Sequence, residues 1–145
     1  MKKLFLIATV TFLTAATFAQ SDKYVASMKA NIAAIDSSFK NPANLLDLAN
    51  KFERIATAEK TQWLAYYYAA LCQVNYTYME QDKSKIDAIA DKATELIDKA
   101  DALQPNNSEI SCLKSMIASA HMMVNPMQRF QEYGQEAASY IEAAM

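Results

Sequence analysis

The chain has 145 residues, of which only one is glycine and three are proline. Phosphate-binding loops and the nucleophile elbow of hydrolases need several glycines at fixed spacing, so neither motif is present. The formal net charge of −2 lacks the basic excess that favours nucleic acid or anionic lipid as a partner. Because the tight turns of β-hairpins depend on glycine, the composition predicts a single all-α domain.

Residues 1–19 have the layout of a secretory signal peptide. A basic start precedes an apolar run over 4–13, and Thr17 and Ala19 place small residues before a cleavage site ahead of Gln20. The apolar run is shorter than the about 20 residues that a membrane span needs; an uncleaved anchor is the alternative. We therefore expect an exported protein of the periplasm or cell envelope, or an extracellular one, with no membrane span in the mature chain.

After residue 20, apolar residues recur at the spacing of amphipathic helices. The pattern predicts six helices: the first over about 20–39, the second from 42 until it fades near 59–60, and the third over about 61–79. The fourth follows a polar break at 81–84 and runs to about 103, the fifth is capped by Asn107 or Ser108, and the sixth runs from 126 to 145. The last of them carries its apolar stripe on Phe130, Tyr133, Ala137, Tyr140, Ile141 and Ala144. Short polar breaks between neighbours predict antiparallel hairpins. These hairpins cover about 20–58, 61–103 and 107–145.

One residue spacing recurs in every second predicted helix. The fourth helix has a small–bulky–small frame closed by proline, formed by Ala93, Ile97, Ala100 and Pro105. The sixth helix repeats it with Ala137, Ile141 and Ala144, and the second helix has Leu48, Phe52 and Ile55 at the same spacing. In the third and fifth helices, Ala70 and Ser115 keep the small residue that lets the two helices of a hairpin approach closely.

This frame resembles the second helix of a tetratricopeptide repeat. Residues 20–145 as a whole resemble small secreted bacterial proteins of the tetratricopeptide-like superfamily. The resemblance implies a right-handed α-solenoid of helical hairpins that binds a protein or peptide, or acts as a scaffold, without catalytic activity. An unrelated up-and-down helical bundle is the alternative. Because helical arrays normally end in a polar cap, the chain is expected to be truncated at Met145 or to leave its last pair weakly covered.

The densest feature with possible chemistry is the aromatic group between Trp63 and Tyr78. Trp63, Tyr67 and Tyr78 fall on the predicted core stripe, whereas Tyr66 and Tyr68 project to either side of Tyr67. Tyrosine suits interfaces because it buries much area and keeps a polar tip. We predict that Tyr66 or Tyr68 contacts a ligand or partner; packing between helices is the alternative.

The single histidine, His121, has no Asp or Glu within four positions. It is expected to lie on a helix surface or partly buried, and not to serve a catalytic relay. The adjacent Met122 and Met123 project about 100° apart on a helix, so they do not converge on copper. No cofactor and no metal site are predicted. The alternative is a periplasmic enzyme or metal-handling protein with a site in the helical groove.

Two cysteines remain, Cys72 and Cys112. In the repeat register their positions differ by five residues, which is about 7.5 Å of helical rise. The two Cα atoms of a disulfide must lie close together. This offset adds to the distance between packed helices, so the two Cα atoms would lie too far apart for a disulfide. The sequence therefore predicts two free, buried thiols.

Overall fold

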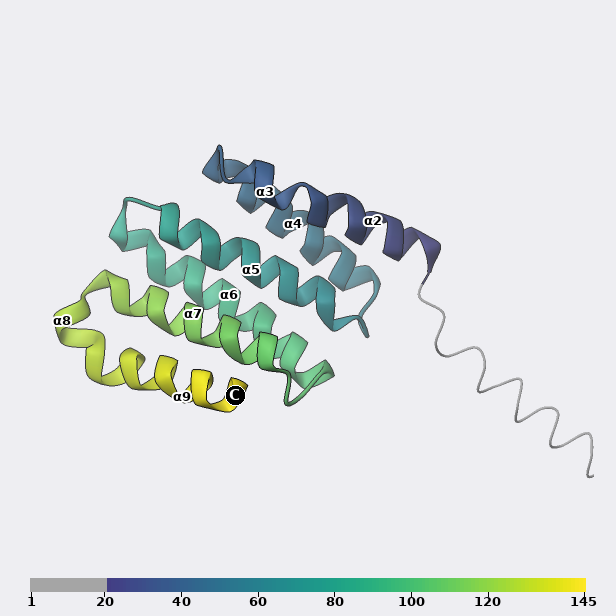
Figure 1. Ribbon diagram of the computed structural model, residues 1–145. Helices are drawn as coiled ribbons and strands as arrows, with labels where there is room; N and C mark the ends of the chain where they lie inside the picture. Colours follow the sequence, from purple (N-terminus) through teal and green to yellow (C-terminus); the bar gives the residue numbers. More distant parts are fainter. Residues whose placement is uncertain (1–20) are drawn as a thin grey trace, which may run out of the picture.

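The computed structural model describes residues 21–145, and the predicted signal peptide lies outside the described residues (Figure 1). Every regular element in this part of the chain is helical, which confirms the predicted all-α class. The elements are α2 (Asp22–Ala33), α3 (Ile35–Ser38), α4 (Pro42–Ala58), α5 (Trp63–Met79), α6 (Lys83–Leu103), α7 (Ser108–Val124), α8 (Pro126–Arg129), the π-helical turn η1 (Phe130–Gly134) and α9 (Gln135–Ala144). None of the described helices is both long and apolar enough to cross a bilayer.

The residues predicted to begin helices lie at helix N-termini in the structure. The side chain of Asn41 accepts a hydrogen bond from a backbone N–H of the first turn of α4, and Pro42 is the first helical residue. Asn107 caps α7 in the same way. Asn125 and Pro126 repeat the pattern at α8. These caps accept hydrogen bonds from backbone N–H groups that have no partner inside the helix. Because the capping residue types are recognisable in the sequence, these helix starts were predicted correctly.

Two of the predicted helices are interrupted. The first divides at Ala34, where the hydroxyls of Ser37 and Ser38 both donate to the Ala34 carbonyl at 2.9 and 2.8 Å. Such bonds compete with the helical pattern of the backbone. The last predicted helix divides into α8, η1 and α9. A π turn adds one residue to a helical turn and is frequent at functional sites; here it carries Tyr133.

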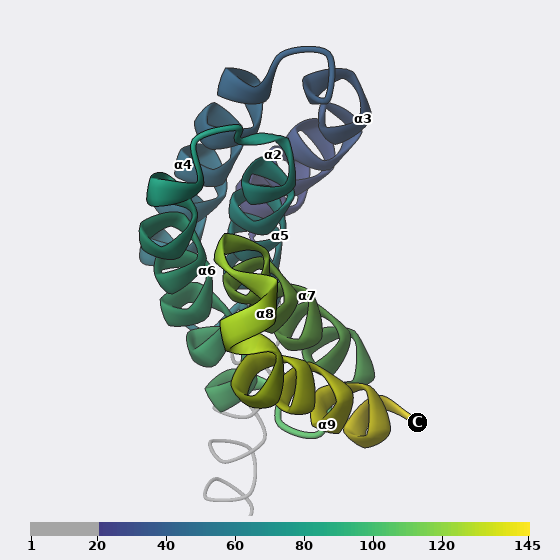
Figure 2. The ribbon, with the colours of Figure 1, turned by 90° about the vertical axis from the view of Figure 1, so that its left-hand side faces the viewer.

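Each helix packs against the next one along the chain. Contacts join α4 to α5, α5 to α6, α6 to α7 and α7 to α9, and α5 also contacts α7. The helices lie side by side in one stack, with α9 at its edge (Figure 1). The turned view places α4 and α6 on one side of the stack and α5 and α7 on the other (Figure 2).

The predicted repeat positions divide between the centre of the stack and its ends. Buried in the core are Leu48, Phe52, Ala70, Ala93, Ile97, Ala100 and Ser115. Half-buried are Ile55, Ala137 and Ala144, and Pro105 lies in the exposed turn between α6 and α7. Ile141, predicted on the apolar stripe of the last helix, is 43% exposed. Among the described residues, α9 packs against α7 on one side only.

Other large apolar side chains are also exposed. They include Phe39, Tyr78, Leu103 and Phe130. The first three lie at or next to a helix end. There the neighbouring helix no longer covers the stripe. A periodic pattern identifies a face of a helix, but it does not show how far the covering helix extends.

Candidate functional site

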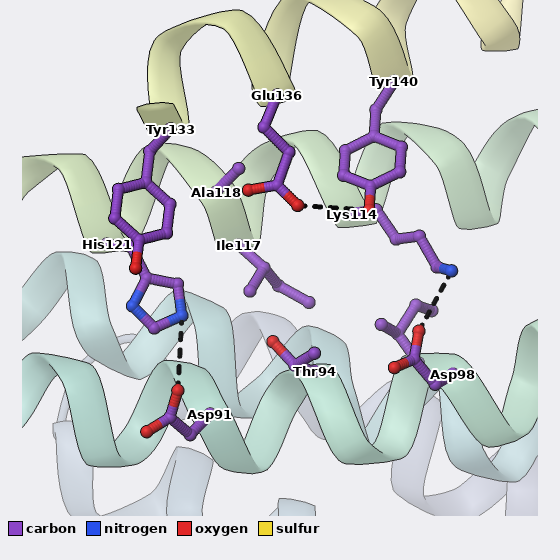
Figure 3. A pocket seen from close by; sticks show the side chains of 11 residues that line it. Asp91, Thr94, Asp98, Lys114, Ile117, Ala118, His121, Tyr133, Glu136 and Tyr140 are labelled. Carbon is purple, nitrogen blue, oxygen red and sulfur yellow. Dashed lines mark hydrogen bonds and ion pairs between the residues drawn. The ribbon is translucent and has the colours of Figure 1, made fainter. Parts of the chain in front are cut away.

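A pocket of about 200 Å³ lies between α6, α7 and the last helical segment (Figure 3). Its lining residues are Asp91, Thr94, Ile97 and Asp98 from α6, Lys114, Ile117, Ala118 and His121 from α7, and Tyr133, Glu136 and Tyr140 from η1 and α9. The floor of the pocket consists of apolar side chains of α6 and α7, because these two helices also pack into the hydrophobic core. Two tyrosine rings come from the helical segment above them, and charged groups occupy the rim (Figure 3).

His121 is the most enclosed titratable group of this pocket, with only 8% of its surface exposed. Its Nδ1 lies 2.9 Å from Asp87 Oδ1. Its Nε2 lies 3.6 Å from Asp91 Oδ1 across the pocket (Figure 3). The ring of Tyr133 stacks on the imidazole with centroids 5.0 Å apart and planes at 19°. His121 therefore has two carboxylate neighbours that its own stretch of sequence does not contain.

The carboxylate of Asp87 is held by two partners. Arg129 donates from Nη1 to Oδ1 at 2.6 Å and from Nη2 to Oδ2 at 2.9 Å, a bidentate pair. Arg129 Nη1 also donates to the backbone carbonyl of His121 at 3.0 Å. The hydrogen bond from Arg129, followed by that from His121, lowers the pKa of Asp87 to about 2. An ionised carboxylate only accepts hydrogen bonds, so the proton of the shared bond lies on His121 Nδ1.

The opposite end of the pocket is organised around Lys114. Its Nζ pairs with Asp98 at 3.0 Å and with Asp101 at 2.8 Å, and it lies 5.8 Å from the centroid of the Tyr140 ring. Burial opposes the charge of Lys114, but the hydrogen bonds to Asp101 and Asp98 outweigh it and raise its pKa. The hydroxyl of Tyr140 donates to Glu136 Oε1 at 3.3 Å. The pocket thus has a histidine at one end and a lysine at the other.

The two tyrosines predicted as ligand contacts lie elsewhere. Tyr68 lines a more open hollow of about 580 Å³, together with Trp63, Leu64 and the turn over 106–109. Its ring stacks on Phe52 at 5.4 Å. Tyr66 is half-buried against the core and does not line this hollow. Neither tyrosine reaches the pocket between α6, α7 and α9, so a contact with ligand stays a prediction for both.

Both cysteines are free thiols, as predicted, but only one is buried. Burial raises the pKa of the Cys72 thiol to about 12. The prediction that Cys112 is buried is wrong, because this residue is exposed. On α7 the residues Ile110 and Leu113 face the core. Cys112 follows Ile110 by two positions, which turns it about 200° away from that face.

The sequence did not reveal the contacts of Asp87 with His121 and Arg129, because they join residues that lie far apart in the chain. A signal was available in the predicted hairpin. Asp87 and His121 lie equally far before and after Gln104, at the turn between the two helices. In an antiparallel hairpin, residues at equal distances from the turn lie level with each other. The predicted turn would therefore have brought the acid and the histidine together.

Comparison with known proteins gives one informative likeness. No family model matches the chain, and no curated protein matches it. Among solved structures, the chain is similar to the HusA haemophore from Porphyromonas gingivalis, with a TM-score of 0.76 and 36% sequence identity. The match covers 88% of this chain and 61% of that chain, so this chain spans less than two thirds of the length of that haemophore. The protein is thus similar, in fold and in sequence, to a haemophore.

Proposed function

We propose that this protein is a non-catalytic binding protein that captures haem at the pocket between α6, α7 and α9. One observation carries the proposal. A chain that is 36% identical to a haemophore has a histidine and two tyrosines, His121, Tyr133 and Tyr140, on the walls of one pocket. Proteins hold haem iron through histidine, tyrosine, cysteine or methionine. Aromatic rings also pack well against flat aromatic ligands.

The size of the pocket defines how haem is bound. Its volume of about 200 Å³ lies below the roughly 300–1,000 Å³ of sites that enclose a drug-sized ligand. The pocket therefore takes one edge of the macrocycle, and the remainder rests against the rim. Such partial enclosure suits a carrier that passes its ligand on.

The charges at the rim define the orientation of haem. Lys114 is the cation of the lining, and Asp91, Asp98 and Glu136 are its carboxylates. The two carboxylates of haem are repelled by like charges and attracted by the ammonium group. Because Lys114 is already paired with Asp98 and Asp101, the repulsion prevails, and the haem carboxylates are expected to point out of the pocket into solvent.

Export and architecture complete the proposal. The predicted signal peptide over 1–19 would deliver the chain to the periplasm, the cell envelope or the medium, where a haem carrier meets its ligand. The stacked helices fit a tetratricopeptide-like right-handed solenoid with hairpins over about 20–58, 61–103 and 107–145. In this division the pocket belongs to the last hairpin and to α6, the final helix of the preceding one.

A second candidate, binding of a protein or peptide, is favoured by the hollow beside Tyr68. Its volume of about 580 Å³ and its lining by Trp63, Leu64 and Tyr68 suit an apolar side chain of a partner. This candidate and the first use different surfaces. They are therefore separable by variants that alter one surface and leave the other intact.

The test is a titration of ferric haem into the wild-type protein and into two matched variants, Tyr140→Ala and Tyr68→Ala, followed by the Soret absorption band. Both substitutions remove one half-buried tyrosine ring. We expect saturable binding to the wild type, weaker binding to Tyr140→Ala, and unchanged binding to Tyr68→Ala. Absence of saturable binding to the wild type, or loss in Tyr68→Ala alone, would overturn haem capture at this pocket.

A further inference from the structure

We propose that Asp91 and Glu136 are specificity-determining residues, which restrict the pocket between α6, α7 and α9 to macrocycles with at least one edge free of carboxylates. This inference rests on the proposed haem capture and names the class of porphyrin that is captured. It follows from three features of the pocket: where its apolar surface lies, which of its charges have partners, and how much of a macrocycle it admits.

The parts of the pocket that an entering edge touches are apolar and aromatic. Ile97, Ile117 and Ala118 belong to its floor and are buried. The rings of Tyr133 and Tyr140 come from the helical segment above them (Figure 3). Methyl and vinyl groups of a macrocycle find suitable contacts here, because removal of apolar surface from water is favourable.

The cationic groups of the lining already have anionic partners. Lys114 Nζ pairs with Asp98 at 3.0 Å and with Asp101 at 2.8 Å. His121 Nδ1 lies 2.9 Å from Asp87, and its Nε2 faces a second carboxylate at 3.6 Å. Neither side chain has positive charge in excess of its neighbours. A carboxylate that entered the pocket would therefore find no free cation with which to pair.

Two carboxylates of the rim are poorly compensated. Glu136 on α9 accepts a hydrogen bond from the Tyr140 hydroxyl at 3.3 Å, and no ion pair joins it to a described residue. Asp91 on α6 contacts His121 Nε2 at 3.6 Å, and its side chain is 72% exposed. A second proton on His121 would match Asp91 alone and leave Glu136 without a cation. The two carboxylates come from opposite walls of the pocket (Figure 3).

An edge that carries a carboxylate is therefore disfavoured in this pocket. The carboxylate would lose water without gaining a partner, which is costly, and it would lie between two like charges. An apolar edge has neither cost. Because the pocket, with a volume of about 200 Å³, admits only one edge, selection depends on where the carboxylates of the ligand lie and not on their number. Haem meets the condition, since both of its carboxylate chains lie on one side of the ring.

The experiment compares two isomers that have the same atoms and the same charge. Coproporphyrins I and III each carry four propionate and four methyl groups. In isomer I every edge between neighbouring pyrroles has a propionate, whereas in isomer III one edge has methyl groups only. The ferric complexes of both isomers, and ferric haem, are titrated at low ionic strength and followed by the Soret band. Because ring, iron and charge are shared by the isomers, a difference in their affinity reports the edge.

Three variants separate the rim charges from net charge. Glu136→Gln and Asp91→Asn each remove one negative charge and keep the shape of the side chain; a double variant combines them. Glu142→Gln is the matched control, because Glu142 also lies on α9 but does not line the pocket. All three residues are exposed, so the variants are expected to fold as the wild type does.

We expect the wild type to bind isomer III at least about tenfold more tightly than isomer I, because like charges that meet across an interface weaken binding by this order or more. Glu136→Gln and Asp91→Asn should each reduce the ratio by strengthening the binding of isomer I, and the double variant should nearly abolish it. Glu142→Gln should leave the ratio unchanged. Added salt should also reduce it, since salt screens charges at the rim.

The possible failures differ in what they overturn. Equal affinity for the two isomers in a wild type that binds haem, or a ratio that the double variant leaves unchanged, would overturn the role of Asp91 and Glu136 but not haem capture. An equal effect of Glu142→Gln would do the same, because it would show a general effect of net charge. A wild type that does not bind ferric haem would overturn haem capture and the selection with it. A preference for isomer III that is lost only with the rim charges would support both.

Discussion

The centre of the stack and its C-terminal end use the same helical frame in different ways. In α4, α5 and α6, the frame residues Phe52, Ala70, Ala93 and Ala100 are fully buried. In α8, η1 and α9, by contrast, no residue is fully buried. That end is held to α6 and α7 by Arg129 on Asp87, Tyr133 on His121 and the packing of α9 on α7. The fully buried packing thus lies in the centre of the stack, and the side chains of the proposed binding pocket lie at its end.

The two regions are also expected to differ in how readily they open. Burial of apolar side chains contributes about 1.5–3 kcal/mol for each large residue. Exposed ion pairs contribute about 0–1 kcal/mol. Because the C-terminal end relies on few buried side chains, α9 should open locally before α5 or α6. Such local freedom suits the proposed entry of one edge of a large ligand.

The largest expected effect is the loss of a central aromatic ring. Phe52→Ala removes a fully buried side chain, and such substitutions reduce the free energy of unfolding by about 3–5 kcal/mol. The matched change Phe130→Ala removes a ring that is 65% exposed and should cost about 0.5 kcal/mol or less. Urea unfolding of both variants measures the difference, and similar losses would contradict the contrast between centre and end.

The next effect is a pH dependence that belongs to the C-terminal end. The pKa of Asp87 is lowered to about 2 in the folded protein, against about 3.9 in an unfolded chain. A lowered carboxyl pKa stabilises the fold above the unfolded value and ceases to do so as the pH falls through the folded value. Stability should therefore decline between about pH 4 and pH 2.

Asp87→Asn should remove that part of the decline while leaving the remaining acid sensitivity unchanged. The measurement is the free energy of unfolding against pH for the wild type and the variant. Curves that remain parallel through this range would show that the clamp with Arg129 does not contribute to stability.

A smaller but sharper contrast lies in the two thiols. Cys112 is exposed, whereas Cys72 is buried with a pKa raised to about 12. The thiolate is the reactive species, so a maleimide should label Cys112 in the native protein and Cys72 only on unfolding. Cys112→Ser is the control, because it should abolish native labelling. If both thiols were labelled at the same rate without denaturant, Cys72 in the centre would be as accessible to the reagent as Cys112 on the surface, which would contradict the contrast.

The smallest effect is expected in the π turn. A Cβ added at Gly134 would lie 3.1 Å from Cδ2 of Phe130, but this ring is exposed and can shift. Alanine favours helical backbone over glycine by about 0.5–1 kcal/mol, which offsets the crowding. Gly134→Ala should thus change the free energy of unfolding by about 1 kcal/mol or less, and a larger loss in thermal or urea unfolding would show that the turn is rigid.

The sequence predicted much of the centre and little of the pocket, for a physical reason. Helix spacing and the caps at Asn41 and Asn107 are local, and both can be read from neighbouring residues. The break at Ala34 depends on serine hydroxyls whose choice of partner is not periodic. The pairing of Asp87 with His121 joins residues 34 positions apart, and it becomes visible only when two helices are laid side by side. The spacing places Tyr133 on the apolar stripe of the last helix, whereas in the structure its ring covers His121.

A crystal structure of the protein loaded with ferric haem tests the central claim most directly. The prediction is that one edge of the macrocycle enters the pocket between Tyr133 and Tyr140. Haem seated instead over Trp63 and Tyr68 would contradict it.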